Sequence, residues 1–459
     1  MATKRTTTPP PPPAAPARPP YMLIEEIRVQ GYKSLVDATL HVRPLTLLAG
    51  TNSSGKSSIM QPLLLIKQTM EAPYQPAGAL VLDGAHVQAE TAGELVSKIT
   101  RSKKFSIVVA GQDKAIKYKE SLAYNSLEIV YEINNSNFII LYQKSSYGSG
   151  DEIILESVKH AKGDVSRVIS LFNQRDVSDK IHDGEIIQDG PFLTLGLRNP
   201  HKEWVGAYAP SVPLFPVLTS IMHVPGLRRK PERSYPATHS QEAVRGTFDL
   251  YAAGIISQWQ QQNNAEALAQ LNDYLVRLGL TNSVTAKVKN ANEVELSVNR
   301  LPSTSKAKPR KADMVNIADV GIGVSQVLPI LVALIAAQEG QIVYVEQPEL
   351  HLHPRAQVAM GELLAEAANR GVRVIVETHS SLLLLTVQTL IAQGKIVNTD
   401  VGLHWFTRDA KGASQVQYVV PDEDGAYGAW PEDFSEIELK AQDAYLTAVG
   451  LRQFGEAAQ

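Results

Sequence analysis

The segment that most constrains the fold is Gly50-Thr-Asn-Ser-Ser-Gly55-Lys56-Ser57, which matches the pattern GxxxxGK[ST]. An apolar strand pattern, Leu45–Ala49, precedes it, and an apolar helical pattern from Ser57 to Met70 follows it. Glycines at both ends permit backbone angles that are closed to other residues, so successive N–H groups can face a phosphate. The pattern therefore predicts a phosphate-binding loop between a strand and a helix.

The residue types in this loop predict how a nucleotide would be held. Lys56 would place its charge between the β- and γ-phosphates, and Ser57 would offer its hydroxyl to Mg²⁺. The other loop positions expected to line the nucleotide site are Gly50, Asn52, Ser53, Ser54, Gly55 and Ser58. We therefore expect ATP and Mg²⁺ as cofactors.

A second buried strand pattern, Gln341–Glu346, runs into Gln347-Pro348-Glu349. We expect this second nucleotide strand beside the strand that precedes the P-loop, where a carboxylate at its end, Glu346, would hold Mg²⁺ through water. The next residue, Gln347, can orient a water molecule but cannot accept its proton at neutral pH, so hydrolysis is expected either to be slow or to be assisted by Glu349 or another group.

The histidines that follow, His351 and His353, have a spacing that suggests a metal site. No third ligand group lies nearby in the sequence on a matching element, so we favour a structural or dimer-interface role over metal binding.

Two further segments indicate contacts with the γ-phosphate. Asp319–Gln326 contains two glycines and Ser325 at the start of a predicted helix, 324–338, which makes a second phosphate site. One chain needs a single such site for its own nucleotide, so Ser325 is expected to reach a partner's nucleotide in a head-to-tail homodimer. The alternative is an ordinary capped helix with a glycine hinge.

The buried strand pattern from Val372 ends near His379, which can contact the γ-phosphate or the attacking water.

Taken in order, these motifs resemble the ABC-type ATPase heads of the SMC–RecF–OLD (overcoming lysogenisation defect) group. The amino-acid sequences of the motifs are most similar to those of the small standalone ATPases of that group, such as the ATPase subunit of the anti-phage system PARIS. The resemblance lies in residues 27–34, 50–58, 319–331, 345–354 and 376–380. It implies phosphate and Mg²⁺ roles for Lys56 and Ser57, Mg²⁺ binding by Glu346, Ser325 in trans, and His379 as a switch. The family's glutamine loop corresponds to either Gln68 or Gln88.

The resemblance and the residue patterns together predict an α/β fold with a P-loop, ABC/SMC-head-like core and a mixed sheet. We expect the core in 21–75 and 310–459, an inserted β-rich lobe in 76–235, and a helical lobe with a basic loop in 236–309. Residues 1–20 hold eight of the 27 prolines and are expected to form a disordered tail.

Composition narrows the function. The chain has no cysteine, which excludes disulfides and cysteine-ligated metals, and no apolar run of membrane-spanning length. We therefore expect a cytoplasmic protein without a membrane partner. No coiled coil separates the halves, and no acidic cluster of a TOPRIM nuclease follows His379.

The expected function is an ATP-binding, slowly hydrolysing switch that forms a homodimer or larger ring. It would control a separate effector such as a nuclease or toxin in anti-phage defence, with nucleic acid or a phage protein as trigger. The alternative is a RecF-like DNA clamp, whose phosphate contacts would come from the basic loop 306–311 and from Arg228, Arg229, Lys230 and Arg233. A third hypothesis is a scaffold that keeps its nucleotide as a fixed structural group. The net charge of −3 gives no global argument for nucleic acid.

Overall fold

The computed structural model describes residues 22–73, 77–113, 124–147, 152–156, 183–237, 244–301 and 311–428, with a few isolated positions besides. Two segments singled out in the sequence lie outside the described residues: the proline-rich tail 1–20 and the basic positions 306–310.

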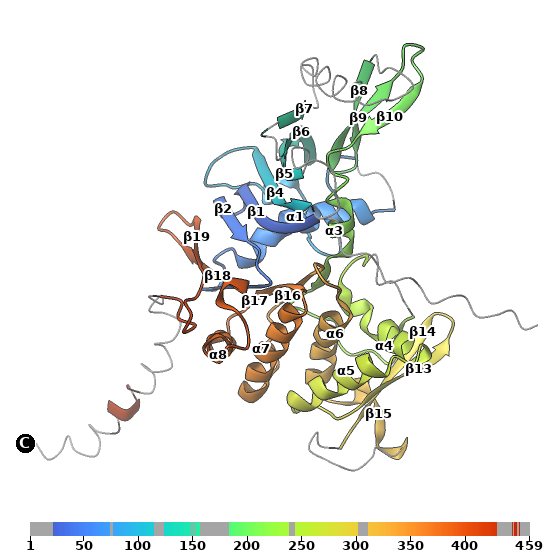
Figure 1. Ribbon diagram of the computed structural model, residues 1–459, viewed down its shortest axis with the longest axis vertical. Coiled ribbons are helices and arrows are strands. Elements are labelled where there is room, and N and C mark those ends of the chain that lie inside the picture. Colours follow the sequence, from blue (N-terminus) through green and yellow to red (C-terminus); the bar gives the residue numbers. More distant parts are fainter. Residues whose placement is uncertain are drawn as a thin grey trace, which may run out of the picture.

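The core of the fold is a six-stranded mixed sheet (Figure 1). Its strands, in spatial order, are β11 (Met222–Val224), β16 (Ile342–Glu346), β17 (Arg373–Glu377), β3 (Leu45–Gly50), β18 (Val401–Arg408) and β19 (Ser414–Val419). The first five are parallel and β19 runs antiparallel to β18. The expected α/β class with a mixed sheet is confirmed.

The strand order corrects one prediction. β16 does not lie beside the P-loop strand β3, because β17 pairs with both: Val374 lies opposite Leu45 on one side and opposite Val343 on the other. Both β16 and β17 are short apolar runs, so their patterns alone could not rank them by distance from β3. The consequence is that the acidic ends of two strands, not one, approach the P-loop.

Helices cover both faces of this sheet because its strands are apolar on both sides. Leu47, Val345 and Val376 face the cluster that contains α6 (Ile322–Ala336), α7 (Pro354–Asn369) and α8 (Ser381–Ala392). Leu48, Tyr344 and Ile375 face the other cluster, which contains α1 (Lys56–Glu71). The helices predicted from Ser57 to Met70 and over 324–338 agree with α1 and α6 to within two residues.

The β-rich lobe stacks on the α1 side (Figure 1). Its main sheet has the order β2 (Leu35–His41), β1 (Met22–Tyr32), β4 (Lys104–Asp113), β5 (Tyr124–Asn134), β6 (Asn137–Tyr147) and β7 (Glu152–Glu156). A three-stranded sheet adds β10 (Trp204–Tyr208), β9 (Phe192–Arg198) and β8 (Asp183–Asp189), and the short helix α3 (Phe215–Ser220) follows. The sheets cross the predicted domain bounds: β1 and β2 pair within the lobe's sheet, and β11 pairs within the core sheet.

The segment expected to be a helical lobe is mixed. It contains α4 (Ala252–Gln261) and α5 (Ala265–Arg277), but also a sheet of β12 (Tyr235–Pro236), β14 (Glu293–Asn299), β13 (Val284–Asn290) and β15 (Met314–Asn316). Five single 3₁₀ turns complete the described elements: Ala92–Glu94, Phe248–Leu250, Lys311–Asp313, Ile317–Asp319 and Asn398–Asp400. In the described part of the chain, no helix combines the length and apolar character needed to cross a bilayer.

Candidate functional site

The P-loop connects β3 to α1 with the geometry that its glycines permit. Gly50 has φ 141°, and a Cβ there would lie 2.1 Å from the carbonyl oxygen of Phe406. Gly55 has φ 102° and precedes the first turn of α1. Both positions require glycine, the first for close approach of β18 and the second for its left-handed backbone.

A serine pair clamps this loop from outside, a feature that the sequence did not suggest. The Ser414 hydroxyl donates to the Ser54 carbonyl oxygen at 2.6 Å and lies 2.8 Å from the hydroxyl of Ser34. Ser34 and Ser414 are 380 residues apart, so no local pattern could pair them. Within the loop, Ser54 is buried, whereas Asn52 and Ser53 are exposed. Ser58, in the first turn of α1, is half-buried.

Lys56 and Ser57 both point toward the strand ends. The Lys56 ammonium is buried and donates to the carbonyl oxygens of Gly50 and Thr51, at 3.1 and 2.7 Å. Burial lowers the pKa of Lys56, and the charges of Glu377 and Glu349 partly offset that effect. The Ser57 hydroxyl donates to Glu377 Oε1 at 2.9 Å, which leaves its oxygen lone pairs free to face a cation.

The ends of β16 and β17 bring two carboxylates together, because Glu346 and Glu377 are direct partners in the strand register. Glu346 accepts from His223 Nε2 at 3.2 Å and from the Gly226 N–H at 3.0 Å. Burial and the nearby charge of Glu346 raise the pKa of Glu377, against the Ser57 hydrogen bond, which lowers it. Glu377 was not among the site residues predicted from the sequence, although it ends a buried strand as Glu346 does.

The residues that follow Glu346 lead into α7 and form hydrogen bonds with the end of β17 and the residues after it. Gln347 has φ 46°, and its N–H donates to the carbonyl oxygen of Glu377 at 2.7 Å. Glu349 Oε1 accepts from the His379 N–H at 2.6 Å, and burial raises the pKa of the Glu349 carboxyl. Burial, followed by the charge of Lys56, lowers the pKa of His379 and favours its neutral ring. The structure thus brings together Lys56, Ser57, Glu346, Gln347, Glu349 and His379.

Arg228 is a second residue whose place the sequence did not predict. We expected it on a basic surface, but it is only 8 % exposed, and its Nη2 donates to the carbonyl oxygens of Glu346 and Gln347 at 2.8 and 3.3 Å. Its Nε and Nη1 find no hydrogen-bond partner among the described residues. The guanidinium of Arg228 is therefore buried against the acidic strand end and is not part of the exposed basic surface that the alternative DNA-clamp hypothesis requires.

Ser325 lies apart from this group. Its hydroxyl donates to the Ile322 carbonyl oxygen within the first turn of α6 at 2.9 Å. It lines a small cavity of about 80 Å³ with Arg228, Arg229 and Lys230, and no P-loop residue lines that cavity.

The remaining candidates have structural roles in the described fold. His353 caps α7 by accepting from the Arg355 N–H, and His351 is exposed with a left-handed backbone. The Gln68 amide is buried and bonded to the loop 81–87 through both its nitrogen and its oxygen. Gln88 is exposed, and no described contact joins it to the P-loop.

The donor set at the strand ends fits Mg²⁺. Oxygen groups of Ser57, Glu346 and Glu377 face one another, and hard cations of this kind prefer carboxylate, hydroxyl, phosphate and water oxygens. Among the described residues, no three His, Asp or Glu side chains form a complete metal-ligand set.

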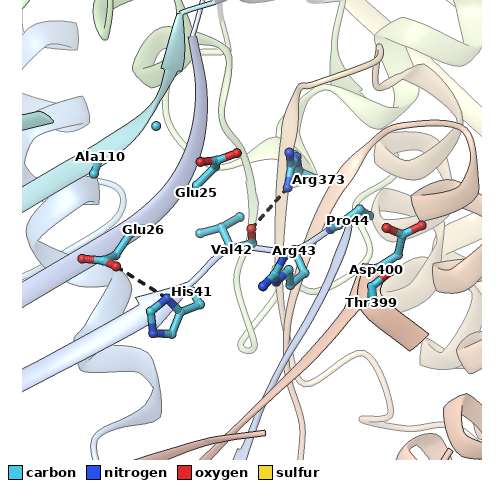
Figure 2. Close-up of a pocket in the computed structure, with 11 residues that line it drawn as sticks. Glu25, Glu26, His41, Val42, Arg43, Pro44, Ala110, Arg373, Thr399 and Asp400 are labelled. Atoms are coloured by element: carbon cyan, nitrogen blue, oxygen red, sulfur yellow. Dashed lines mark hydrogen bonds and ion pairs between the residues drawn. The ribbon is translucent and has the colours of Figure 1, made fainter. Parts of the chain in front are cut away.

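A second cavity, of about 490 Å³, lies at the opposite end of β3 from the P-loop (Figure 2). In its wall, Arg373 Nη1 donates to the Val42 carbonyl oxygen at 3.2 Å, and His41 Nδ1 lies 3.5 Å from Glu26 Oε2. Acidic and basic side chains line it together, so its charge favours neither cations nor anions.

Comparisons with solved structures give three SMC head domains at 12 % sequence identity, each matching 87 % of this chain. One is an SmcHead bound to the C-winged helix domain of ScpA (98 % of that chain, TM-score 0.42). Another is an Smc head with an extended coiled coil bound to the C-terminal domain of ScpA from Pyrococcus furiosus (96 %, 0.42). The third is the SMC head domain from Thermotoga maritima (99 %, 0.35).

No curated protein matches the chain in sequence. A family model described as "AAA domain, putative AbiEii toxin, Type IV TA system" matches residues 45–385, from the P-loop strand through the His379 segment. The match spans 341 of the 459 residues and includes the P-loop, Ser325, the acidic ends of β16 and β17, and His379. The chain belongs to this family of AAA-domain proteins.

Proposed function

We propose that the protein is an ATP-dependent switch that binds Mg²⁺–ATP at the P-loop and hydrolyses it slowly. The observation that carries this proposal is the meeting of Lys56 and Ser57 with the acidic ends of β16 and β17. The position after Glu346 holds the amide of Gln347 instead of a carboxylate, which supports slow turnover.

On nucleotide binding, Lys56 would exchange the loop carbonyls it now contacts for phosphate oxygens. Ser57 would hold Mg²⁺ directly and Glu346 would hold it through water, while Glu377 fixes the Ser57 hydroxyl. The bound Mg²⁺ would neutralise phosphate charge during transfer. The chain's own contribution is to place these oxygens before the nucleotide arrives.

For hydrolysis, Gln347 would orient the attacking water and Glu349 would accept its proton. The raised pKa of Glu349 makes its carboxylate a better base than an exposed glutamate. The neutral ring of His379 would contact the γ-phosphate. The backbone N–H of His379 donates to the Glu349 carboxylate, which places the ring close to the base. The buried guanidinium of Arg228 would stabilise negative charge that develops at the strand end.

The assembly we propose is a homodimer or larger ring in which Ser325 acts on a partner's nucleotide. Its support is that Ser325 lines a cavity in which three basic and two acidic residues take part and its own P-loop does not. In that cavity Arg229 is mostly exposed, as expected for a surface that meets another chain's phosphate.

The proposed biological role is control of a separate effector in prokaryotic defence, consistent with the toxin named in the family description and the resemblance to anti-phage ATPases. A RecF-like DNA clamp has weaker support. Arg228 is buried, Arg233 forms an ion pair with Asp319 at 2.7 Å, and Arg229 lies 3.9 Å from Asp249, so three of the four basic residues proposed over 228–233 are already engaged.

The test combines binding of a fluorescent ATP analogue with single-turnover hydrolysis. Lys56→Ala should abolish binding, while Glu349→Gln should bind normally and hydrolyse at least about 100-fold more slowly. Lys98→Ala, at an exposed lysine of the lobe, is the control and should match the wild type. A folded wild type that binds no Mg²⁺–ATP, or a Lys56→Ala variant that binds it equally well, would overturn the proposal.

A further inference from the structure

A line of ionisable side chains runs from Glu346 into the interior, away from the P-loop. His223 Nε2 lies 3.2 Å from Glu346 Oε1, and His223 Nδ1 lies 2.9 Å from His86 Nδ1. His86 Nε2 lies 3.5 Å from Glu71 Oε2, and Glu71 Oε1 lies 2.6 Å from Lys67 Nζ. Five side chains from α1, the loop before η1 (Ala92–Glu94), β11 and β16 therefore form one connected path.

This path is shielded from water. The side chains of Lys67 and His86 are fully buried, and His223 is 2 % exposed. Its inner end is fixed by the backbone, because Lys67 donates to the carbonyl oxygens of Thr219 and Val244 and Glu71 accepts from the Gly246 N–H. Buried polar groups with this many partners hold one geometry, since breaking any contact leaves an unsatisfied group.

The donor and acceptor of each hydrogen bond along the path can be assigned in turn. A carboxylate only accepts, so His223 Nε2 must donate to Glu346. In a neutral ring His223 Nδ1 then accepts, and His86 Nδ1 must be the donor to it. That leaves His86 Nε2 without a proton for Glu71, which agrees with the longer separation of 3.5 Å between His86 Nε2 and Glu71 Oε2.

We propose that His223 is a positioning residue that holds the Glu346 carboxylate for Mg²⁺, and that the bond from His86 Nδ1 to His223 Nδ1 keeps the His223 ring in the orientation in which Nε2 donates to Glu346. The proposal deepens the function above, because it rests on Glu346 serving the metal. Partners of this kind behind a metal-binding group commonly change metal affinity about 10- to 100-fold when they are removed. The motif analysis did not find the pair because His86 and His223 are 137 residues apart.

Two near-isosteric variants test His223. In His223→Gln the side-chain amide nitrogen can occupy the place of Nε2 and keep the bond to Glu346, whereas in His223→Asn it reaches only the place of Nδ1. The probe is Mg²⁺ titrated against a fluorescent ATP analogue. We expect half-saturation near the wild-type concentration in His223→Gln and at about 10- to 100-fold more Mg²⁺ in His223→Asn.

A metal-free readout tests His86. Nitrogen-15 spectra of the histidine rings, assigned by substitution, should show His223 protonated at Nε2 in the wild type and a mixture of tautomers in His86→Leu. His404→Gln, at an equally buried histidine outside this path, should change neither the spectrum of His223 nor the Mg²⁺ titration.

The outcomes separate the two proposals. If the wild type needs Mg²⁺ and His223→Asn needs no more of it, the positioning role is wrong and the ATP switch stands. If His86→Leu leaves His223 in a single Nε2 tautomer, His86 does not hold the His223 ring. If the wild type binds no nucleotide, the proposed function fails. The nitrogen-15 spectra of the metal-free protein still decide whether His86 controls the protonation of the His223 ring. A His223→Asn chain that does not fold leaves the decision to His223→Gln and His86→Leu.

Discussion

Replacing Arg228 by methionine should remove activity without destabilising the protein. The guanidinium is held by two backbone carbonyl oxygens and by no carboxylate within ion-pair distance among the described residues. A buried cation kept in such a place is expected to serve function more than stability.

The magnitude follows from its pKa. Burial lowers the pKa of Arg228 from 12.5 to about 10, even though Glu349, Glu346 and Asp249 act to raise it. At about 1.4 kcal/mol per unit, the folded state bears a cost of roughly 3 kcal/mol at every pH below about 10. Methionine removes that cost and also removes hydrogen bonds worth about 2–3 kcal/mol, so the free energy of unfolding should change by less than about 1.5 kcal/mol.

The assay pairs urea unfolding at pH 7.5 with single-turnover ATP hydrolysis. We expect Arg228→Met to unfold near the wild-type midpoint and to hydrolyse ATP at least about 100-fold more slowly. Arg228→Lys, which keeps the charge but not the planar fork, should be intermediate in rate. A variant that loses about 3 kcal/mol or more of stability while retaining turnover would show that Arg228 is structural and refute the reasoning.

Three further predictions concern stability and assembly. Burial lowers the pKa of His404 from 6.5 to about 3, so the stability it contributes is complete above pH 6.5 and lost toward pH 3. Between pH 7.5 and pH 5.0, the free energy of unfolding measured with urea should fall by about 2 kcal/mol in the wild type and by less in His404→Gln. An equal fall in the two proteins would contradict this prediction. Gly50→Ala should cost at least about 3 kcal/mol, because its Cβ meets the Phe406 carbonyl oxygen, whereas Gly412→Ala, where a Cβ meets nothing within 4 Å, should cost only about 1 kcal/mol; equal thermal shifts would disprove it. Ser325→Arg should bind ATP yet remain monomeric in light scattering, and a dimer of normal affinity would argue against the role in trans.

Much of the core could be predicted because its signals are local. The P-loop pattern, the apolar strands and the helices α1, α6, α7 and α8 each depend on residues close in sequence. The order of strands could not be predicted, since β16 and β17 have the same apolar pattern and only pairing decides which lies beside β3. The sheet that each flanking strand joins could not be predicted for a similar reason, because β1 pairs with β4 beyond α1, and the three-residue β11 pairs with β16 far along the chain.

The candidate site shows the same division. Lys56, Ser57 and Glu346 were found through motif spacing, and the structure brings them together. Glu377, Arg228 and the His86–His223 pair were missed because their roles come from contacts between distant segments. For Arg228 the sequence was misleading, since a run of basic residues usually indicates an exposed surface and here its first member is buried.

The most direct test of the central claim is the mass of the purified protein in solution with Mg²⁺–ATP, measured alongside the fraction of ATP hydrolysed. An ATP-dependent switch predicts at least a doubling of mass on ATP binding, reversal as ATP is slowly consumed, and persistence of the larger form in Glu349→Gln. Lys56→Ala should remain at the smaller mass throughout. A mass that does not change with ATP while nucleotide is bound would contradict the switch and leave only a nucleotide-binding scaffold.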